Sequence, residues 1–439
     1  MPPGSAWMRG NNKTTLAATT ILTGRTGRRW FRRLGPGLIT GAADDDPSGI
    51  ATYSQAGAQF GYQLGWTVVL TLPLMVAVQL ISARIGRVTG KGLAANIREH
   101  FPVPVLYAIV IMLLVANTIN IAADIAAMGE SVRLVVGGSS HVYAVLFGVT
   151  CLMLEVFLTY RQYVRYLKWL TVALFSYVAV VFAIDVPWLK VLTESIWPRL
   201  AMSSGMLTVV VAVLGTTISP YLFFWQAAQE VEEMKSSSVA RALKKRPAHS
   251  RWHLDRITID TVTGMTLSNL IAFFIIVATA ATLNRAGVTN IQSSAQAAEA
   301  LRPLAGEFAS LLFSMGIVGT GLLAVPVLAG SAAYAVAESF RWKGGLDLQP
   351  RQAKGFYAIV AVATLGGVAL NFTRIDPIQA LFWTAVINGV IAVPIMAVMM
   401  SLAGKRSVMG PFIVNRGVKL LGWAATAIMA VAVAAMLLV

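Results

Sequence analysis

Charge and cysteine are both scarce in this sequence. Only 12% of the 439 residues are charged, whereas a soluble domain usually carries about a quarter. The single cysteine, Cys151, excludes a disulfide framework, a cysteine-rich zinc site and an iron–sulfur cluster. It lies in an apolar run, where the expected role is that of a small core residue. Because 56% of the residues are hydrophobic and the mean hydropathy is +0.69, we expect most of the chain to lie in a membrane.

The usual signatures of enzymes are also missing. The sequence has no nucleophile elbow, no phosphate-binding glycine loop and no His/Cys metal cluster. Its four histidines, His100, His141, His249 and His253, fall in predicted loops or at predicted helix ends. That placement disfavours a zinc site or a histidine proton relay within the membrane. We therefore expect no enzyme activity and no bound cofactor.

Long apolar windows dominate the rest of the sequence. Windows of about 18 or more apolar residues predict membrane-spanning helices. Eleven are expected, at about 35–62, 65–83, 104–128, 141–159, 166–185, 203–229, 258–282, 307–338, 354–371, 376–401 and 418–438. They predict an all-α polytopic membrane protein. Its parts are a basic tail (1–34), a ten-helix core (35–401) and a final segment (402–439) that holds a loop and the eleventh helix.

The basic residues predict the orientation of these helices. With the N-terminus inside, the predicted cytoplasmic segments hold 29 of the 35 lysines and arginines and the outer segments hold six. The positive-inside rule then places the N-terminus in the cytoplasm and the C-terminus outside. The tail is interpreted as cytoplasmic rather than as a signal peptide. Since this distribution accounts for the net charge of +16, no nucleic-acid partner is needed. We expect an integral protein of the bacterial plasma (inner) membrane. The sequence leaves its oligomeric state open, and a monomer is compatible with it.

Two predicted helices are interrupted at corresponding places. The first contains "DDDPSG" (44–49) and the sixth contains "GTTISPY" (215–221). Proline removes a backbone donor and glycine eases the departure from helical geometry. The breaks fall in the first members of two five-helix sets, 35–185 and 203–401. Because a unit of five spans must be inverted when it is repeated, the pattern predicts the inverted-repeat architecture of many secondary transporters.

The first break supplies a candidate cation ligand. Asp46 directly precedes Pro47, so its carboxylate lies at the break, where unwound backbone also frees carbonyl oxygens. An Asp-Pro pair is equally a good helix start, so a capping role stays open beside metal binding. Asp44 and Asp45 should point in other directions. They are candidates for an entry path or for pairing with a cation elsewhere.

Other predicted helices add polar side chains. The sixth supplies oxygens beside Pro220, from Thr216, Thr217, Ser219 and Tyr221. The third carries Asn117, Asn120 and Asp124 at helical spacing, which places them on one face. An intramembrane aspartate usually has a function, and we expect this face to meet the first break or a water path from it. Further polar positions are Glu155, Asp260, Asn269 and Asn388. Glu155 and Asp260 lie near predicted cytoplasmic ends, where we expect them to be solvated.

These motifs resemble those of a known family. The stretch "GPGLITGAADDDPSGIATYSQAGAQFGYQLGW" (35–66) resembles the first helix of the Nramp divalent-metal transporters, whose signature there is Asp-Pro-Gly-Asn. The resemblance continues through the third helix, the 215–221 break and "ITID" (257–260). It implies a LeuT-like fold of two inverted five-helix repeats plus an eleventh helix. It also implies a divalent metal ion as the transported substrate.

The resemblance implies a ligand set and shows where this sequence departs from it. The family aspartate matches Asp46, but the family asparagine falls on Gly49. The family methionine falls on Ser219, and the helix 6 carbonyl ligand falls on Thr216. Since a thioether helps to select transition metals, a site lined only by oxygen suits magnesium better. The departures resemble the Nramp-related magnesium transporter branch.

The proton route implied by the resemblance is only partly present. The family histidine falls on Tyr221. Acidic positions in the family's third helix fall on Asn117 and Ala127, while its aspartate matches Asp124. We therefore expect uptake of magnesium, manganese or both by alternating access, with weak or no proton coupling. Three alternatives stay open. They are a proton-coupled manganese or iron importer, a sodium-coupled carrier of small solutes, and a receptor or scaffold without transport. The buried acids argue against the last two.

Overall fold

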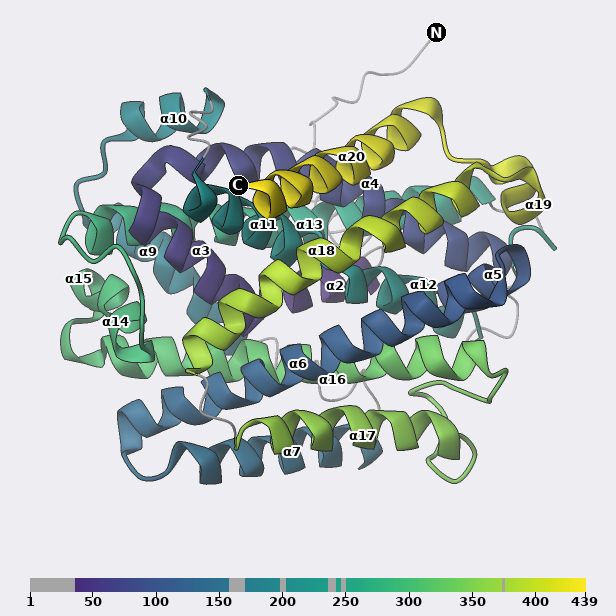
Figure 1. Ribbon diagram of the computed structural model, residues 1–439, viewed down its shortest axis with the longest axis horizontal. Helices are drawn as coiled ribbons and strands as arrows, with labels where there is room; N and C mark the ends of the chain where they lie inside the picture. The colour runs from purple at the N-terminus through teal and green to yellow at the C-terminus, as the bar shows by residue number, and fades with distance from the viewer. Residues whose placement is uncertain (1–35, 158–169, 198–202, 236–241, 246–249, 373–375) are drawn as a thin grey trace, which may run out of the picture.

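Long apolar helices run side by side through the molecule (Figure 1). The computed structural model describes residues 36–157, 170–197, 203–235, 242–245, 250–372 and 376–439. Within these ranges the chain is helical and contains no strand. The predicted tail (1–34), His249 and the first residues of the predicted fifth helix (166–169) lie outside them.

Eight helical runs within the described ranges are long and apolar enough to cross a membrane. They are Pro47–Thr89, Val103–Val136, Ser140–Phe157, Ser204–Lys235, Ser250–Asn284, Ser294–Ser339, Pro377–Gly404 and Arg416–Leu438. A bent pair, Val172–Ala183 and Trp188–Ile196, turns by 118° and makes a ninth if it is one span. The shorter apolar helix α17 (Lys354–Leu370) lies at the predicted ninth position.

The second half of the first predicted helix and the second predicted helix form one continuous run. Helix α3 (Pro47–Phe60) passes through the short 3-10 turn η1 (Gly61–Leu64) into α4 (Gly65–Thr89). Gly61 adopts a φ of +60°, a backbone conformation that glycine tolerates without steric cost. The chain therefore changes direction without a loop.

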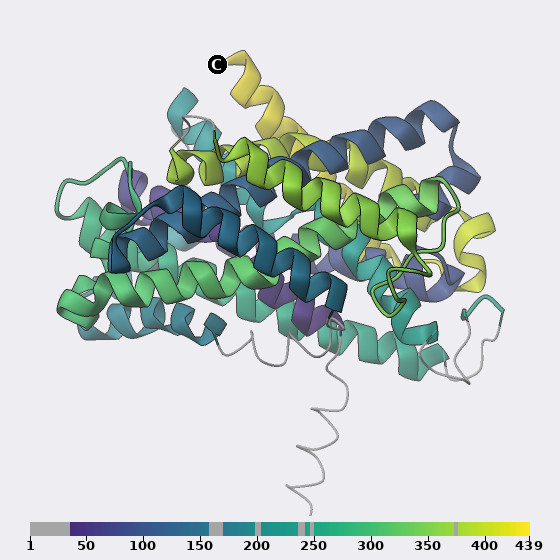
Figure 2. The ribbon, with the colours of Figure 1, turned by 90° about the horizontal axis from the view of Figure 1, so that it is seen from below.

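Both predicted breaks are confirmed. The first predicted helix divides into α2 (Pro36–Asp44) and α3, and the sixth divides into α11 (Ser204–Thr217) and α12 (Pro220–Lys235). Pro47 and Pro220 open the second half of each pair. Proline is favoured at the first helical position, where its missing N–H costs nothing. The half-helix α2 lies in the middle of the bundle, and α3 lies toward the end that holds α9 (Phe175–Ala183) (Figures 1 and 2).

Longer helices surround these half-helices. The principal ones are α6 (Val103–Val136), α7 (Ser140–Phe157), α13 (Ser250–Thr279), α16 (Ala309–Ser339), α18 (Pro377–Gly404) and α20 (Arg416–Leu438). Shorter helices connect them at both ends of the bundle: α5 (Leu93–His100), α9 (Phe175–Ala183), α10 (Trp188–Ile196), α14 (Ser294–Ala298), α15 (Arg302–Ala305) and α19 (Arg406–Met409).

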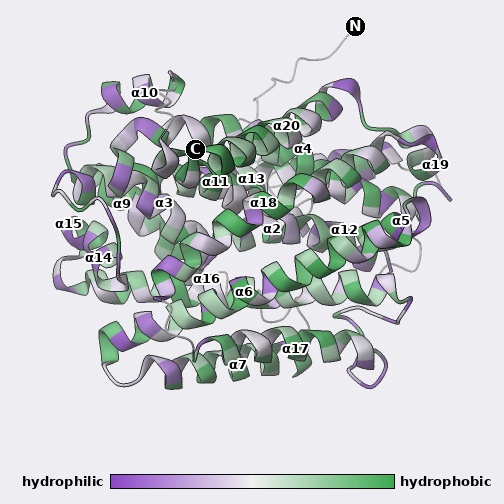
Figure 3. Ribbon diagram, viewed as in Figure 1, coloured by the Kyte–Doolittle hydropathy of each residue, from purple (hydrophilic) through white to green (hydrophobic). Residues whose placement is uncertain are grey.

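The helices of the bundle are largely apolar (Figure 3). Large exposed hydrophobic side chains include Ile111 and Val115 on α6, Leu146 and Met153 on α7, and Val431 on α20. Many polar side chains are instead buried in the interior, around the helix breaks. An apolar exterior with a polar interior fits a lipid environment, because lipid cannot hydrogen-bond exposed polar groups. The lipid bilayer is therefore the natural surroundings of this fold.

One buried ion pair joins α12 to α13. The Nη2 of Arg256 lies 2.8 Å from the Oε2 of Glu230, and Arg256 also pairs with Glu233. Replacing Arg256 with alanine leaves a buried carboxylate without its main cation, so we expect a loss of about 3–5 kcal/mol of stability. The comparison is Arg133→Ala, which breaks an exposed pair with Glu130 and should cost less than about 1 kcal/mol. Thermal unfolding in detergent measures the stability loss of both variants. Equal shifts of the melting temperature would contradict the stabilising role given to the buried pair.

Candidate metal centre

Asp46 lies between the two halves of the first helix and is 1% exposed. Its Oδ1 accepts hydrogen bonds from the Ser48 hydroxyl and the Gly49 N–H, each at 2.7 Å. It is therefore the N-cap of α3, and the capping role left open by the sequence is confirmed. Its Oδ2 has only two long contacts, to Asn120 Nδ2 and to the Tyr221 hydroxyl, both at 3.4 Å. The cap fixes the carboxylate and leaves Oδ2 weakly held.

The two helix breaks meet at Asp46. A Cβ placed on Gly49 would lie 3.3 Å from the Thr216 Oγ1, so the first turn of α3 faces the end of α11. The Tyr53 and Thr217 hydroxyls are 3.0 Å apart. On the other side, the Tyr221 hydroxyl donates to the Ala43 carbonyl at 3.0 Å. The structure thus brings Asp46, Gly49, Thr216 and Tyr221 together from segments about 170 residues apart.

The α11 end supplies neutral oxygen atoms. The Ser219 hydroxyl lies 2.7 Å from the Thr216 carbonyl and 3.2 Å from the Gly215 carbonyl. The Thr216 Oγ1 is buried and has no hydrogen-bond partner within the described ranges. A buried polar atom without a partner is uncommon and calls for an explanation. The first break thus carries a carboxylate oxygen, and the second carries carbonyl and hydroxyl oxygens, which are the donor types that hard cations take.

The polar face of α6 divides between two neighbours. Asn120 reaches Asp46, whereas the amide nitrogen of Asn117 donates to the Leu328 carbonyl at 2.8 Å and to the Ser331 hydroxyl at 2.7 Å on α16. Asp124 is completely buried, and neither of its carboxylate oxygens has a partner within the described ranges. The predicted face is therefore confirmed as buried. Only its middle residue, Asn120, touches the break.

Asp44 and Asp45 meet a residue that the sequence did not single out. The Ser268 hydroxyl on α13 lies 2.8 Å from Asp44 Oδ2 and 3.0 Å from Asp45 Oδ1. The three acids therefore point to two sides of the chain, as expected, but two of them share one partner. The only signal for Ser268 was one hydroxyl in an apolar helix. Most such hydroxyls bond their own backbone.

Two expected solvated acids are buried instead. Glu155 is 2% exposed, and both of its carboxylate oxygens lack a hydrogen-bond partner within the described ranges. Asp260 is completely buried, and its Oδ2 accepts the Gly37 N–H at 2.7 Å. The prediction of solvation was wrong for both, because neighbouring helices cover these positions. Cys151 is buried as predicted.

The remaining polar positions have structural neighbours. Asn269 donates to the Val68 carbonyl at 2.8 Å and so joins α13 to α4. Asn388 on α18 is 1% exposed, and its amide nitrogen has no partner within the described part of the chain. The next residue, Gly389, packs directly on Gly215 of α11. This contact places Asn388 beside the α11 half of the second break.

The histidine and cysteine side chains of the described ranges do not gather at the helix breaks. No group of three or more His, Cys, Asp and Glu side chains in the described ranges is placed to hold an ion. His100 ends α5, His141 begins α7 and His253 lies in the first turn of α13. A metal at the breaks would therefore be held by Asp46 and neutral oxygens.

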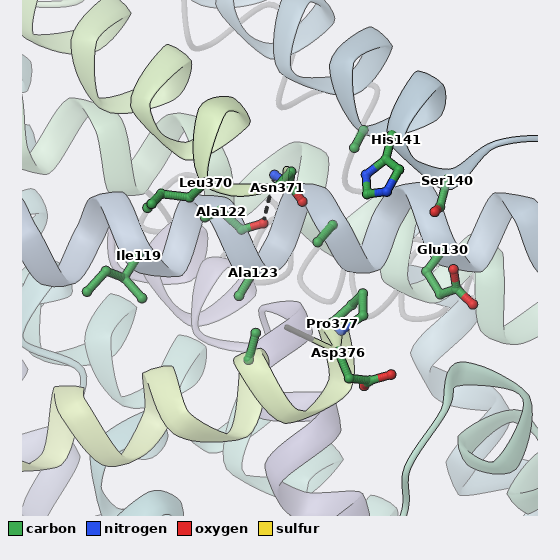
Figure 4. A pocket seen from close by; sticks show the side chains of 13 residues that line it. Ile119, Ala122, Ala123, Glu130, Ser140, His141, Leu370, Asn371, Asp376 and Pro377 are labelled. Atoms are coloured by element: carbon green, nitrogen blue, oxygen red, sulfur yellow. Dashed lines mark hydrogen bonds between the residues drawn. The ribbon is translucent and has the colours of Figure 1, made fainter. Parts of the chain in front are cut away.

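Two pockets open beside the core. The pocket of Figure 4, about 580 Å³, lies between α6, α7 and α18 and is lined in part by Glu130, His141 and Asp376, with none of the predicted ligands. A second pocket of about 330 Å³ is lined by α3, α11 and α18. It includes Ala51, one turn beyond Pro47. The second pocket therefore approaches the helix breaks.

Two known proteins are similar to this chain in sequence. The chain is 27% identical over 402 residues to the divalent metal cation transporter MntH of Klebsiella pneumoniae, which covers 90% of this chain and 91% of that protein. It is 29% identical over 302 residues to MntH of Aeromonas hydrophila, covering 66% of this chain and 69% of that protein.

Solved structures share the fold. A manganese transporter of Eremococcus coleocola, in complex with an aromatic bis-isothiourea substituted compound, superposes with a TM-score of 0.72 at 16% identity, covering 93% of this chain and 86% of that one. The nucleobase-cation-symport-1 transporter Mhp1 gives a TM-score of 0.54 at 16% identity, with 92% of each chain covered. The architecture is thus the predicted LeuT-like fold of two inverted five-helix repeats and an eleventh helix. Since the family model described as natural resistance-associated macrophage protein-like matches residues 37–439, the chain belongs to the Nramp family.

Proposed function

We propose that this protein carries divalent metal cations across a membrane by alternating access. The observation that carries the proposal is the meeting of the two helix breaks: Gly49, whose N–H bonds Asp46, lies against Thr216, and the Tyr221 hydroxyl lies 3.4 Å from Asp46 Oδ2. The names of the relatives support it, since they are called a divalent metal cation transporter and a manganese transporter. Asp46 provides the charge, and the neutral oxygens replace part of the ion's water shell.

Magnesium is the preferred ion in this proposal, and manganese is accepted. The positions of the family's asparagine and methionine are held by Gly49 and Ser219, so no thioether faces the ion. Hydroxyl and carbonyl oxygens favour hard cations, and magnesium keeps several waters when it binds. Gly49 lets the first turn of α3 approach the second break closely, because a Cβ there would lie 3.3 Å from Thr216 Oγ1 and 3.4 Å from the Asp44 carbonyl oxygen.

The proposal also includes the orientation of the chain in the membrane and the conformational state of the transporter. The basic loops place the N-terminus in the cytoplasm and the C-terminus outside, in the plasma membrane of a bacterium. In this conformation α2 packs tightly on α13 and closes the cytoplasmic side, since the Gly37 N–H donates to Asp260. The pocket beside Ala51, Gln55 and Gln379 lies at the other end. This pocket is the external entry path.

Proton coupling is weak or absent in the proposed mechanism. The Tyr221 hydroxyl donates to the Ala43 carbonyl at the position where the family has a histidine. Asn117 is bonded to α16 at a position where the family has an acid. Asp124 remains, buried and without a partner in the described part of the chain. That one observation favours the second candidate, a proton-coupled manganese or iron importer.

Transport in liposomes separates these candidates. The purified protein is reconstituted, and the entry of magnesium, manganese and protons is followed in parallel. The proposal expects uptake of magnesium and manganese in competition with each other, with little proton entry. Manganese entry with protons and no competition by magnesium would establish the second candidate. Uptake that requires sodium and an organic solute would overturn both.

Ser219→Met tests the selectivity argument. The substitution puts a thioether at the helix 6 break and removes the hydroxyl that bonds the Thr216 carbonyl. We expect the ratio of manganese to magnesium transport to rise by about 10-fold, because soft donors favour transition metals. Thr263→Ala is the control, since that hydroxyl bonds only its own helix at the Ile259 carbonyl. An unchanged ratio in Ser219→Met would refute the role given to this position.

A further inference from the structure

Asp44, Asp45 and Ser268 form a buried cluster on the side of α2 that faces α13. Their exposed fractions are 1%, 4% and 1%. The single Ser268 hydroxyl lies within hydrogen-bond distance of both carboxylates. A serine hydroxyl has one hydrogen, so it can donate to only one of them. The other carboxylate is left without that donor.

A second observation points to a missing positive partner. The other oxygen of Asp44, Oδ1, is buried and has no hydrogen-bond partner within the described ranges. None of the ion pairs found among the described residues involves Asp44 or Asp45. Buried carboxylates are costly unless they are paired or coordinate a metal. A cation at Asp46 would lie on the other side of the chain, toward Asn120 and Tyr221.

We propose that Asp44, Asp45 and Ser268 form a second cation site, separate from the one at Asp46, which takes a hard divalent cation such as magnesium. Two carboxylates balance the two positive charges. The Ser268 oxygen, once its hydrogen is turned away, is a neutral third ligand, and water completes the shell. This inference goes beyond the proposed function, because transport at Asp46 does not require it.

The position of the cluster gives the second site a mechanical role. Its members join α2 to α13, and they lie one helical turn beyond the place where Gly41 contacts the backbone of Gly264. The contact between Gly37 and Asp260 lies one turn further back. The second site therefore exists only while α2 is packed on α13. An ion bound there stabilises the closed cytoplasmic side, and its departure accompanies the opening of α2.

Counting bound ions tests the second site. The full-length protein in detergent is titrated with Mn²⁺, and bound ions are measured by electron paramagnetic resonance. We expect two ions per wild-type chain, one in Asp46→Asn and one in the double variant Asp44→Asn, Asp45→Asn. Ser268→Ala is a milder change, and it should lower the affinity for one of the two ions by about 10-fold. Thr263→Ala, on the same helix, should leave both unchanged.

The outcomes distinguish this inference from the proposed function. One ion per wild-type chain, lost in Asp46→Asn and kept in the double variant, overturns the second site and leaves the transport site standing. One ion lost in the double variant but kept in Asp46→Asn supports the cluster and overturns the site at Asp46. If the double variant does not fold, the ion count and affinities of Ser268→Ala test the second site instead. Two ions of unchanged affinity in that variant would contradict the role of Ser268.

Discussion

Asp46→Asn is expected to reduce divalent-cation transport by more than about 100-fold. Loss of a group that merely supports a metal ligand already lowers metal affinity by about 10–100-fold, and here the charged ligand itself is removed. Asparagine is chosen because it caps helices as well as aspartate does, so the bond to the Gly49 N–H should persist. The variant therefore removes charge with little effect on the start of α3. Uptake by proteoliposomes measures the loss.

The chain contains a matched control for this experiment. Asp376 precedes Pro377 and caps α18, accepting the Ile378 N–H at 2.9 Å and the Gln379 N–H at 3.3 Å. Asp376→Asn thus changes the same Asp-Pro motif away from the helix breaks. It should retain transport close to that of the wild type. Equal transport by Asp46→Asn and Asp376→Asn would remove Asp46 from the ion site.

Gly41→Val is expected to prevent α2 from closing on α13. A Cβ at Gly41 would lie 2.4 Å from the carbonyl carbon and oxygen of Gly264, and neither backbone has a flexible side chain that can move aside. Overpacking of this kind costs about 1–3 kcal/mol, which corresponds to a shift of roughly 5–150-fold between two states. Because alternating access needs the closed state in every cycle, transport should fall by a similar factor.

Cysteine labelling tests whether Gly41→Val loses transport because α2 no longer closes on α13. Cys151 is the only cysteine, so Cys151→Ser gives a cysteine-free background into which Thr261→Cys is placed. Thr261 is 1% exposed and lies against Gly37 of α2. Labelling by a membrane-impermeant maleimide from the cytoplasmic side should rise in Gly41→Val. Gly417→Val is the control, since no atom lies within 4 Å of a Cβ at that position. Normal transport with unchanged labelling in Gly41→Val would contradict the closed contact.

Sequence alone predicted the features that depend on local chemistry. The breaks at Pro47 and Pro220, the cap at Asp46 and the buried face of α6 all follow from proline, side-chain capping and helical spacing. The apolar windows also predicted the helices, and the main error was one of continuity. Because Gly61 allows a turn without a loop, α3 and α4 form a single run. The predicted helix 65–83 likewise extends to Thr89.

Contacts between helices were beyond the reach of the sequence. Ser268 has no signature that separates it from a hydroxyl bonded to its own helix, yet it joins Asp44 and Asp45. Glu155 was expected in water because of its place near a helix end. Its burial depends on how the neighbouring helices pack around α7, which no single helix encodes. Asn117 and Asn120 share a face but bond to different partners, on α16 and at Asp46.

The side chains at the two helix breaks are the feature to compare between this chain and the solved structures of the same fold. The fold is shared with these structures, and in the proposal the side chains at the two breaks of this chain select the ion. In this chain Gly49 stands at the first break, beside Asp46, and Ser219 stands at the second. The central claim is that a divalent cation binds there, between the two breaks.

Anomalous X-ray scattering from crystals soaked in Mn²⁺ tests that claim most directly. The account predicts a manganese peak within coordination distance of a carboxylate oxygen of Asp46, between the two helix breaks. The same peak should be absent from crystals of Asp46→Asn. A manganese peak that lies elsewhere and persists in that variant, with none between the breaks, would contradict the account.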